Sequence, residues 1–290
     1  MISRRTLLPG LLLAAPTLLS LPAAADTGNA DLQHRFASLE RKHGGHLGVA
    51  VLDTAKANPA TYRGNERFPL CSTYKCLAAA CVLARVDRKE DNLARRIVYT
   101  KAGLVPYSPV TEKHVGEPGL TIAELCDAAV TLSDNTAGNL LLDSFGGPAA
   151  LTAYLRSLGD AVTRLDRREP ELNEAKPGDL RDTTTPLAML ETLRKIVLGT
   201  ALSPSSREQL TAWLVADKVG DQRLHAGLPD GWRIGDKTGS GARNATNDVA
   251  VIWPPSRPPI LVTVYYIDSP ASAKARNAVL AEIGRLTAAA

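Results

Sequence analysis

Stretches of continuous or alternating hydrophobic residues predict β-strands near both ends of the chain. One lies early, GHLGVAVLDTA at residues 45–55. Three lie late, and these are GWRIGDKTGSG at 231–241, NDVAVIWP at 247–254 and PPILVTVYYID at 258–268. The segment PPSRPP between the last two favours a hairpin loop. Because the early strand has no partner nearby in the chain, we expect both chain ends to meet in one antiparallel sheet.

The middle of the chain has the spacing and the start signals of helices. Thr121 and Glu124 have the pattern of a capping box. Thr185-Pro186 reads as an N-cap followed by proline in the first turn, and residues 203–204 repeat this signature. The predicted helices lie within residues 121–132, 146–159, 185–199, 203–220 and, at the end of the chain, 272–290.

These elements predict an α+β fold in which an antiparallel sheet, built from both chain ends and flanked by helices, lies beside an all-helical lobe. We expect residues 26–63 and 216–290 to form the α/β domain, and residues 64–215 to form the helical domain. A cleft between two such units is a favoured place for a ligand, so we expect the active site there.

Residues 1–25 have the pattern of a signal peptide. A charged start precedes an apolar run from Leu7 to Leu21, and Ala23-Ala24-Ala25 supplies small residues for cleavage. The run is shorter than the roughly 20 residues of a bilayer-spanning helix. Arg4 and Arg5 are compatible with the twin-arginine export route. We therefore expect an exported protein, periplasmic or secreted, without stable membrane association after cleavage.

Composition narrows the range of partners. The 290 residues are 44% hydrophobic and 22% charged, and the formal net charge is +4 with basic and acidic residues interspersed. This pattern disfavours nucleic-acid binding. The pair His43 and His46 is not part of an H-E-x-x-H motif and the chain has no C-x-x-C motif, so we expect no metal site and no cofactor. We expect a monomer.

Four cysteines in so long a chain do not form a disulfide scaffold. One bridge, Cys76 to Cys126, and a set of buried free thiols that also includes Cys71 and Cys81 are two open alternatives.

The segment TRLDRREPELNEAKPGDLRDTTT (163–185) fits neither a helix nor a strand. Loops this long are usually functional or disordered. We name residues 163–183 the charged loop and include it in the helical domain. By composition alone a solvated surface loop is favoured, although Arg167 and Asp182 could hold the loop in place.

Three short motifs carry possible chemistry. In CSTYKC, Ser72 and Lys75 are three apart, so they share one helix face, and a lysine that burial deprotonates could activate the serine. Ser133-Asp134-Asn135 suits a tight turn, or offers a hydroxyl and an amide to a ligand. Lys237-Thr238-Gly239 lies on a predicted strand, where it could bind an anion or simply protect a sheet edge. Each motif alone is weak.

Their order is informative, because S-x-x-K, S-D-N and K-T-G occur in this order in class A β-lactamases and penicillin-binding proteins. The chain resembles a class A serine β-lactamase over nearly all of its mature length. Further stretches that carry the resemblance are YSPVTEKH, ELCDAAVTLSDNTAGNLLL, RLDRREPELNEAKPGDLRDTTTP and NDVAVIWPP. The resemblance implies the α+β fold with a helical lobe and hydrolysis of the β-lactam amide through a serine acyl-enzyme.

The resemblance also implies the catalytic roles. Ser72 would be the nucleophile and Lys75 its activating neighbour, while Ser133 would pass a proton to the departing ring nitrogen. Glu169 matches the E-x-x-L-N motif and would activate water, with Glu171 as the rival carboxylate. Whether Lys75 or Glu169 is the acylation base stays open.

The other implied roles concern substrate binding. Asn135 would hold the ligand amide, and Asn173 would hold the hydrolytic water. Tyr107 would line the cleft mouth. Lys237 and Thr238 would bind the substrate carboxylate. The backbone N–H groups of Ser72 and Ser240 would form the oxyanion hole.

The chain departs from the pattern at three places. Thr246 stands where many members have an arginine, so we expect Arg223 to bind the carboxylate, with Arg243 as its rival. Gly241 stands where carbapenemase-type members have the disulfide partner of Cys71, which argues against carbapenem hydrolysis. Ala79 replaces the first cysteine of the family's common disulfide.

Two other functions share the serine and lysine motifs. A D,D-peptidase acts on peptidoglycan and is blocked by penicillin, and a β-lactam sensor becomes acylated without turnover. Glu169 with Asn173 argues against the peptidase, and the lack of recognisable signalling segments argues against the sensor.

Overall fold

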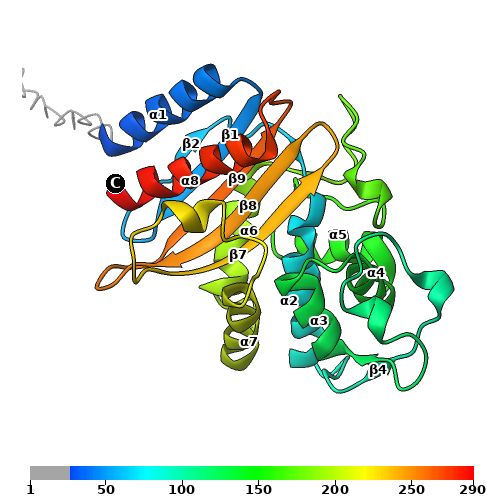
Figure 1. Ribbon diagram of the computed structural model, residues 1–290. Coiled ribbons are helices and arrows are strands. Elements are labelled where there is room, and N and C mark those ends of the chain that lie inside the picture. The colour runs from blue at the N-terminus through cyan, green and yellow to red at the C-terminus, as the bar shows by residue number, and fades with distance from the viewer. Residues whose placement is uncertain (1–26) are drawn as a thin grey trace, which may run out of the picture.

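The computed structural model describes residues 27–290, so the expected signal peptide lies outside the described residues. At its centre is a five-stranded antiparallel sheet with the strand order β2-β1-β9-β8-β7 (Figure 1). The strands are β1 (His46–Asp53), β2 (Ala60–Tyr62), β7 (Arg233–Gly241), β8 (Ala245–Trp253) and β9 (Ile260–Ile267).

Both chain ends contribute to this sheet. The early strand β1 pairs along its whole length with β9, from His46 opposite Ile267 to Asp53 opposite Ile260. The strands β8 and β9 form the expected hairpin, and β7 is the edge strand beside β8. The predicted meeting of the two chain ends in one antiparallel sheet is confirmed.

Two helices, α1 (Thr27–His43) and α8 (Ala273–Ala289), lie across one face of the sheet (Figure 1). They bury a hydrophobic layer that includes Phe36, Tyr266 and Leu280. The hydrophobic pattern of the sequence did not predict α1. Its apolar positions Leu32 and Phe36 are one helical turn apart, but most of the residues around them are polar, which weakens the periodic signal.

The opposite face carries α6 (Pro186–Val197), which contacts β1 and β9, and beyond it the helical lobe. One hydrophobic cluster runs from this face of the sheet into the lobe, so the two parts share a core. The fold is α+β, as predicted. The remaining helices are α2 (Tyr74–Asp87), α3 (Ile122–Thr131), α4 (Asn135–Ser144), α5 (Gly147–Ser157) and α7 (Pro204–Val215).

The predicted helix starts are confirmed by their caps. At α3 the backbone N–H of Thr121 donates to Glu124 Oε2 at 2.7 Å, and the N–H of Glu124 donates to Thr121 Oγ1 at 3.1 Å. At α6 the hydroxyl of Thr185 accepts from the N–H of Ala188. Ser203 caps α7 in the same way.

Short elements connect the larger ones. The two-residue strands β3 (Phe68–Pro69) and β6 (Thr183–Thr184) pair, and this pairing fixes the end of the charged loop beside the residues that precede Ser72. The others are β4 (Arg96–Ile97), β5 (Leu120–Thr121) and the 3₁₀ turns η1 (Cys71–Thr73), η2 (Lys101–Gly103), η3 (Thr111–Lys113), η4 (Glu171–Asn173) and η5 (Leu224–Gly227).

The charged loop is packed against the protein, unlike the solvated loop that its composition favoured. Asp182 is buried, and its Oδ1 accepts from the backbone N–H groups of Asp166 and Arg167. Its Oδ2 accepts from Nε of Arg167 at 2.6 Å. Glu169 and Leu172 are also buried. One buried carboxylate thus closes the base of the loop with three hydrogen bonds.

All four cysteines are buried free thiols. The bridge Cys76–Cys126, one of the two alternatives, is therefore absent, and the thiol of Cys76 donates to the carbonyl of Thr73. In residues 27–290, none of the helices has the length and apolar character to span a membrane.

Candidate active site

Ser72 lies at the junction of the sheet and the helical lobe, in the 3₁₀ turn η1 that leads directly into α2. Both Ser72 and Lys75 are buried, and the three-residue spacing places Nζ of Lys75 3.0 Å from Oγ of Ser72. Lys75 does not extend to solvent, because it has no exposed surface.

Lys75 is surrounded by oxygen atoms from three segments. Nζ donates to the backbone carbonyl of Ser133 at 2.8 Å and to Oδ1 of Asn135 at 2.6 Å, and it lies 3.2 Å from Oε1 of Glu169. Burial lowers the pKa of Lys75 from 10.5 to about 8, against the opposing effect of the Glu169 carboxylate. At neutral pH this lysine is therefore uncharged, and able to accept a proton, more often than an exposed lysine is.

Glu169 reaches this lysine from the charged loop. Its Oε1 accepts from Oγ of Ser72 at 3.3 Å, and its Oε2 accepts from Nδ2 of Asn173. Asn139 of α4 fixes the backbone, because its amide accepts from the N–H of Glu169 and donates to the carbonyl of Glu169, both at 2.9 Å. Asn139 is a positioning residue that the sequence analysis missed, and its place four residues after Asn135 on one helix face was the available signal.

Ser133, Asp134 and Asn135 form the turn between α3 and α4. The Asp134 side chain caps α4 through the N–H of Ala137, and Ser133 adopts a positive φ of 58°. The turn places Oγ of Ser133 between two ammonium groups, 3.4 Å from Nζ of Lys75 and 3.2 Å from Nζ of Lys237. A hydroxyl in this position can pass a proton.

Lys237 and Thr238 lie on the edge strand β7. Lys237 is fully buried and donates to Ser133 and to the backbone carbonyl of Thr238. Burial lowers the pKa of the Lys237 ammonium, and the nearby carboxylate of Asp217 opposes this shift. The strand therefore presents a cation and a hydroxyl at the edge that faces Ser72.

The two arginine candidates have different surroundings. Arg223 donates to Oγ of Ser240 at 2.7 Å and to the carbonyl of Gly239 at 3.0 Å, which places its guanidinium on β7 beside the cleft. Arg243 instead forms an ion pair with Asp268 and donates to the carbonyl of Ala175.

These residues surround a cleft of about 360 Å³. Lys75, Glu169 and Lys237 are buried behind its surface, whereas Tyr107 is 58% exposed at its edge. The cleft therefore exposes hydroxyl and amide groups together with Arg223, and it keeps Lys75, Glu169 and Lys237 behind them. Its lining residues are Ser72, Tyr107, Ser133, Asn135, Asn173, Val219, Arg223, Thr238, Gly239 and Ser240.

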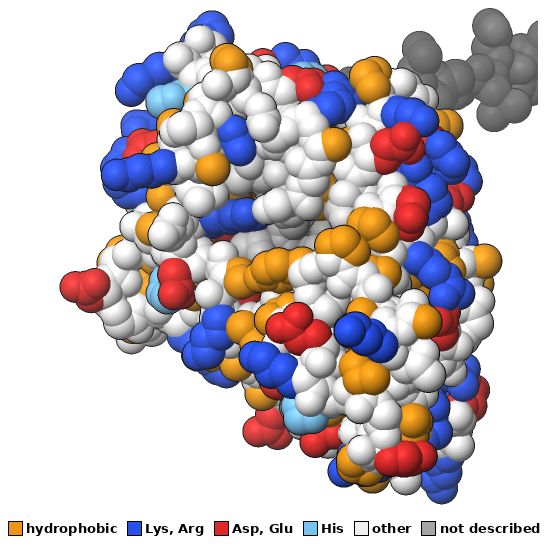
Figure 2. Space-filling view, turned by 45° about the vertical axis from the view of Figure 1, so that its right-hand side comes forward, with side chains coloured by type: hydrophobic (Ala, Val, Ile, Leu, Met, Phe, Trp, Pro, Cys, Tyr) orange, Lys and Arg blue, Asp and Glu red, His pale blue; other side chains and the backbone are white. Residues whose placement is uncertain are grey.

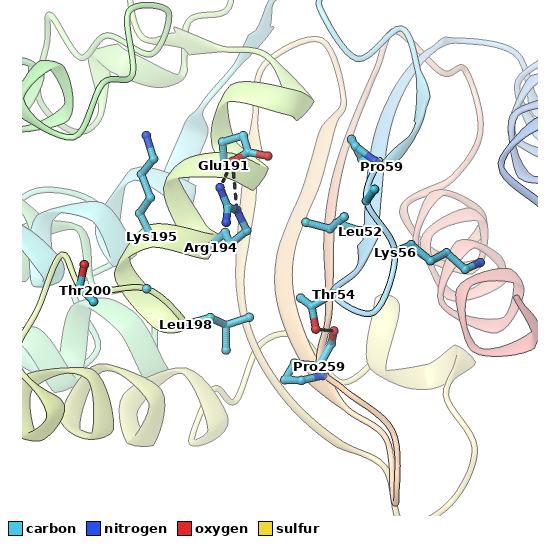
Figure 3. Close-up of a pocket in the computed structure, with 12 residues that line it drawn as sticks. Leu52, Thr54, Lys56, Pro59, Glu191, Arg194, Lys195, Leu198, Thr200 and Pro259 are labelled. Atoms are coloured by element: carbon cyan, nitrogen blue, oxygen red, sulfur yellow. Dashed lines mark hydrogen bonds and ion pairs between the residues drawn. The ribbon is translucent and has the colours of Figure 1, made fainter. Parts of the chain in front are cut away.

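A larger cavity, of about 650 Å³, lies elsewhere, between α6 and the end of β1 (Figure 3). Leu52, Leu198 and Pro259 form part of its wall, and Arg194 is paired with Glu191 (Figure 3). This cavity lacks a nucleophile with a neighbouring base, so we do not assign the chemistry to it.

No group of three or more His, Cys, Asp or Glu side chains within residues 27–290 is arranged to hold a metal ion. Basic and acidic side chains are interspersed on the face in Figure 2, which agrees with the charge pattern of the sequence.

Comparisons with known proteins agree with this geometry. The model of the Beta-lactamase enzyme family matches residues 31–290. Beta-lactamase OXY-1 of Klebsiella oxytoca is 47% identical over 276 residues, which cover 94% of this chain and 93% of that protein. Beta-lactamase CTX-M-8 of Citrobacter amalonaticus is 47% identical over 256 residues, which cover 88% of each chain.

Solved structures give the same result. An ancestral class A β-lactamase superposes with a TM-score of 0.87 at 67% identity and covers 88% of this chain and 98% of its own. The putative class A β-lactamase PenP of Rhodopseudomonas palustris superposes with a TM-score of 0.88 at 58% identity, with 89% and 99% covered. The chain therefore belongs to the class A β-lactamase family.

Proposed function

We propose that the protein opens the β-lactam ring of penicillins and cephalosporins through an acyl-enzyme on Ser72 and then releases the product with a water that Glu169 activates. One observation carries this proposal. A buried carboxylate and a buried amine both lie within hydrogen-bonding distance of one serine hydroxyl, at 3.3 Å and 3.0 Å. A hydroxyl is a weak nucleophile until such a neighbour removes its proton.

In the first step Oγ of Ser72 attacks the lactam carbonyl carbon and its proton moves to a base. Lys75 and Glu169 are both placed to accept this proton, directly or through water. The backbone N–H groups of Ser72 and Ser240 would stabilise the negative oxygen that forms, an interaction worth about 3 kcal/mol for each donor.

Collapse of this intermediate breaks the carbon–nitrogen bond, and the ring nitrogen needs a proton. Ser133 would supply it, because its hydroxyl lies within 3.4 Å of Nζ of both Lys75 and Lys237, from which it can be reprotonated.

The substrate would be held at two ends. Lys237 and Thr238 of β7 would bind the carboxylate together with Arg223, whose guanidinium lies beside that strand. Asn135 lines the cleft and would contact the side-chain amide, while Tyr107 would flank the ligand at the mouth.

Hydrolysis of the ester completes the cycle. Glu169 would take a proton from a water held with Asn173 as that water attacks the acyl carbon. The same proton would then pass from Glu169 to Oγ of Ser72, 3.3 Å away, as the ester bond breaks. The clamp of Asn139 and Asn173 on Glu169 supports this role, since a general base must be held within reach of its proton.

This clamp favours hydrolysis over the two other functions. A D,D-peptidase or a sensor needs the serine, but it does not need a buried carboxylate held beside the ester. Gly241 in place of a cysteine beside Cys71 leads us to expect little carbapenem hydrolysis.

We also infer that the protein acts after export, in the periplasm or outside the cell, and that it acts as a monomer. Its α/β domain would consist of residues 26–63 and 216–290, and its helical domain of residues 64–215. The cleft would lie between these two domains. The signal-peptide pattern of residues 1–25 supports export, with Arg4 and Arg5 compatible with the twin-arginine route.

The direct test is spectrophotometric hydrolysis of benzylpenicillin, a cephalosporin and a carbapenem by the purified protein. We expect turnover of the first two and little of the third. Ser72→Ala should remove hydrolysis while the protein stays folded. An unchanged penicillin, or a wild-type protein that one equivalent of penicillin acylates permanently, would contradict the proposal.

A further inference from the structure

Three buried aspartates lie behind the carboxylate-binding edge of the cleft and take no part in the proposed chemistry. Asp236 precedes Lys237 on β7, Asp248 lies on the neighbouring strand β8, and Asp217 follows α7. Their side chains are 4%, 0% and 9% exposed, so hydration cannot stabilise three negative charges there. We name these three residues the acid cluster.

Each aspartate of the acid cluster has a buried oxygen without a hydrogen-bond donor. These atoms are Oδ2 of Asp217, Oδ2 of Asp236 and Oδ1 of Asp248. Two of them face the same point, because a Cβ atom placed on Gly220 would lie 2.0 Å from Oδ2 of Asp236 and 2.7 Å from Oδ2 of Asp217. Two facing acceptors without a donor repel each other unless a proton lies between them.

The two nearby cations do not satisfy these oxygens. The guanidinium of Arg223 donates to the carbonyls of Gly239 and Asn247 and to the hydroxyl of Ser240. Lys237 donates to Ser133 and to the carbonyl of Thr238. Within residues 27–290, neither cation has an ion pair to the acid cluster, although both lie in its field.

The electrostatics agree with a retained proton. Burial, reinforced by the charges of Asp248 and Asp217, raises the pKa of Asp236 well above its usual value. Burial also raises the pKa of Asp217, and it raises the pKa of Asp248 to about 6. The charged or titratable groups that face the acid cluster are Lys237 and Arg223, and these two cations in turn interact with the thiols of Cys76 and Cys71.

We propose that Asp236 holds one proton at neutral pH and shares it with Asp217 and Asp248, so that the acid cluster positions Lys237 and Arg223 toward the substrate carboxylate. One proton on three carboxylates leaves two negative charges beside two cations. This balance keeps the ammonium and the guanidinium charged. It also leaves both cations unpaired with a carboxylate, so that Lys237 keeps its hydrogen bond to Ser133 and Arg223 keeps its hydrogen bond to Ser240, both of which line the cleft. Asp236 is thus a positioning residue.

The proton itself can be observed without substrate. Difference infrared spectroscopy between wild type and Asp236→Asn at neutral pH should show the C=O stretch of a protonated carboxylic acid in the wild type alone. Absence of that band overturns the proposal, whether or not the protein hydrolyses penicillin. The infrared band therefore tests the shared proton separately from the proposed function, on which the positioning role rests.

Stability against pH gives a second readout. Because the pKa of Asp236 is raised in the folded state, its contribution to stability is complete below about pH 4 and is lost as the pH rises through the folded value. Asp236→Asn carries a permanent donor, so the difference in urea midpoint between the variant and wild type should move in favour of the variant from about pH 5 to pH 9. If Asp236→Asn does not fold, the same comparison of urea midpoints can be made with Asp217→Asn.

Asp160→Asn is the matched control. Asp160 is also buried, but both of its oxygens accept, from the N–H groups of Val162 and Thr163 and from the hydroxyl of Thr192. An amide there loses acceptors, so this variant should have a lower urea midpoint than wild type across the same range. An Asp236→Asn variant that loses as much stability as Asp160→Asn at neutral pH overturns the proposal.

Kinetics test the positioning role. Asp236→Ala removes the donor, so KM for benzylpenicillin should rise by about fivefold or more, with a smaller change in kcat. Asp236→Asn should recover most of that loss. Equal KM values in the two variants would contradict the positioning role, since only Asp236→Asn keeps a hydrogen-bond donor at this position.

Discussion

Nζ of Lys75 lies 3.2 Å from Oε1 of Glu169, and neither side chain has any exposed surface. The pair comes from two segments almost a hundred residues apart, the first turn of α2 and the charged loop, and Oγ of Ser72 contacts both. Removing either partner leaves the other buried without its counter-charge, so each substitution changes the pKa of the group that remains.

Glu169→Ala should separate the two halves of the catalytic cycle. The ester would still form, because Lys75 remains beside Ser72, but hydrolysis of the ester would slow by about 10²–10⁴-fold, the usual contribution of a positioned base. Mass spectrometry after addition of benzylpenicillin should then show a persistent adduct of one penicillin per protein.

Glu171→Ala is the control for this experiment. Glu171 is the rival carboxylate of the same loop, and its side chain is exposed. This variant should turn over benzylpenicillin at close to the wild-type rate. A persistent adduct in Glu171→Ala, or no persistent adduct in Glu169→Ala, would show that Glu169 is not the residue that activates the water.

Lys75 gives a prediction about pH. Its pKa is lowered by burial to about 8, and the Glu169 carboxylate opposes this shift, so the lysine pKa should fall further in the Glu169→Ala variant. If uncharged Lys75 is the acylation base, the single-turnover acylation rate of Glu169→Ala should rise with pH and level off at or below about pH 8.

Lys75→Arg in the same background keeps a positive charge that does not titrate in this range. Its acylation should be slow and independent of pH. A Glu169→Ala protein that acylates about a thousandfold more slowly than wild type at every pH would make Glu169 the acylation base instead.

The local pattern of the sequence was enough to predict much of the fold and part of the site. Alternating hydrophobic residues identified β1 and β9, and caps such as Thr121 with Glu124 placed the helix starts, since both signals lie within a few neighbouring residues. The spacing of Ser72 and Lys75 likewise predicted one shared helix face, because that relationship is local.

Contacts between distant segments needed the structure. The spacing within the charged loop does not show that Glu169 turns inward, because Asn139 of α4 and the buried Asp182 decide that orientation. The acid cluster was missed for the same reason. Asp217, Asp236 and Asp248 come from three elements, and each one alone reads as an ordinary polar residue.

Arg223→Ala should weaken binding of the substrate carboxylate. Loss of a hydrogen bond to a charged group costs about 1.5–3 kcal/mol, so KM for benzylpenicillin should rise by roughly 10- to 100-fold. Arg243→Ala should change KM much less, because Arg243 is engaged with Asp268 and the carbonyl of Ala175. Steady-state kinetics of both variants provide the comparison.

A penicillin methyl ester tests the mechanism of that effect. Arg223 also supports β7 through the carbonyl of Gly239, so its loss could act through the strand itself. If it acts on the carboxylate, Arg223→Ala should impair the free acid far more than the ester. If Arg223→Ala impairs hydrolysis of the free acid and of the ester equally, Arg223 only stabilises the strand and does not bind the carboxylate.

Gly241→Cys should form a disulfide with Cys71. A Cβ atom on Gly241 would lie 2.7 Å from Sγ of Cys71, close to the separation of these atoms in a disulfide. The same Cβ would lie 3.1 Å from the carbonyl oxygen of Asn173, so the bridge would press on the charged loop.

Burial raises the pKa of Cys71 to about 12, which makes its thiol slow to oxidise without an oxidant or a partner in contact. Alkylation under denaturing conditions, followed by mass spectrometry, should find three free thiols among the five cysteines of the oxidised variant. Five alkylated cysteines after oxidation would show that the edge of β7 and the turn before Ser72 are farther apart than the structure places them.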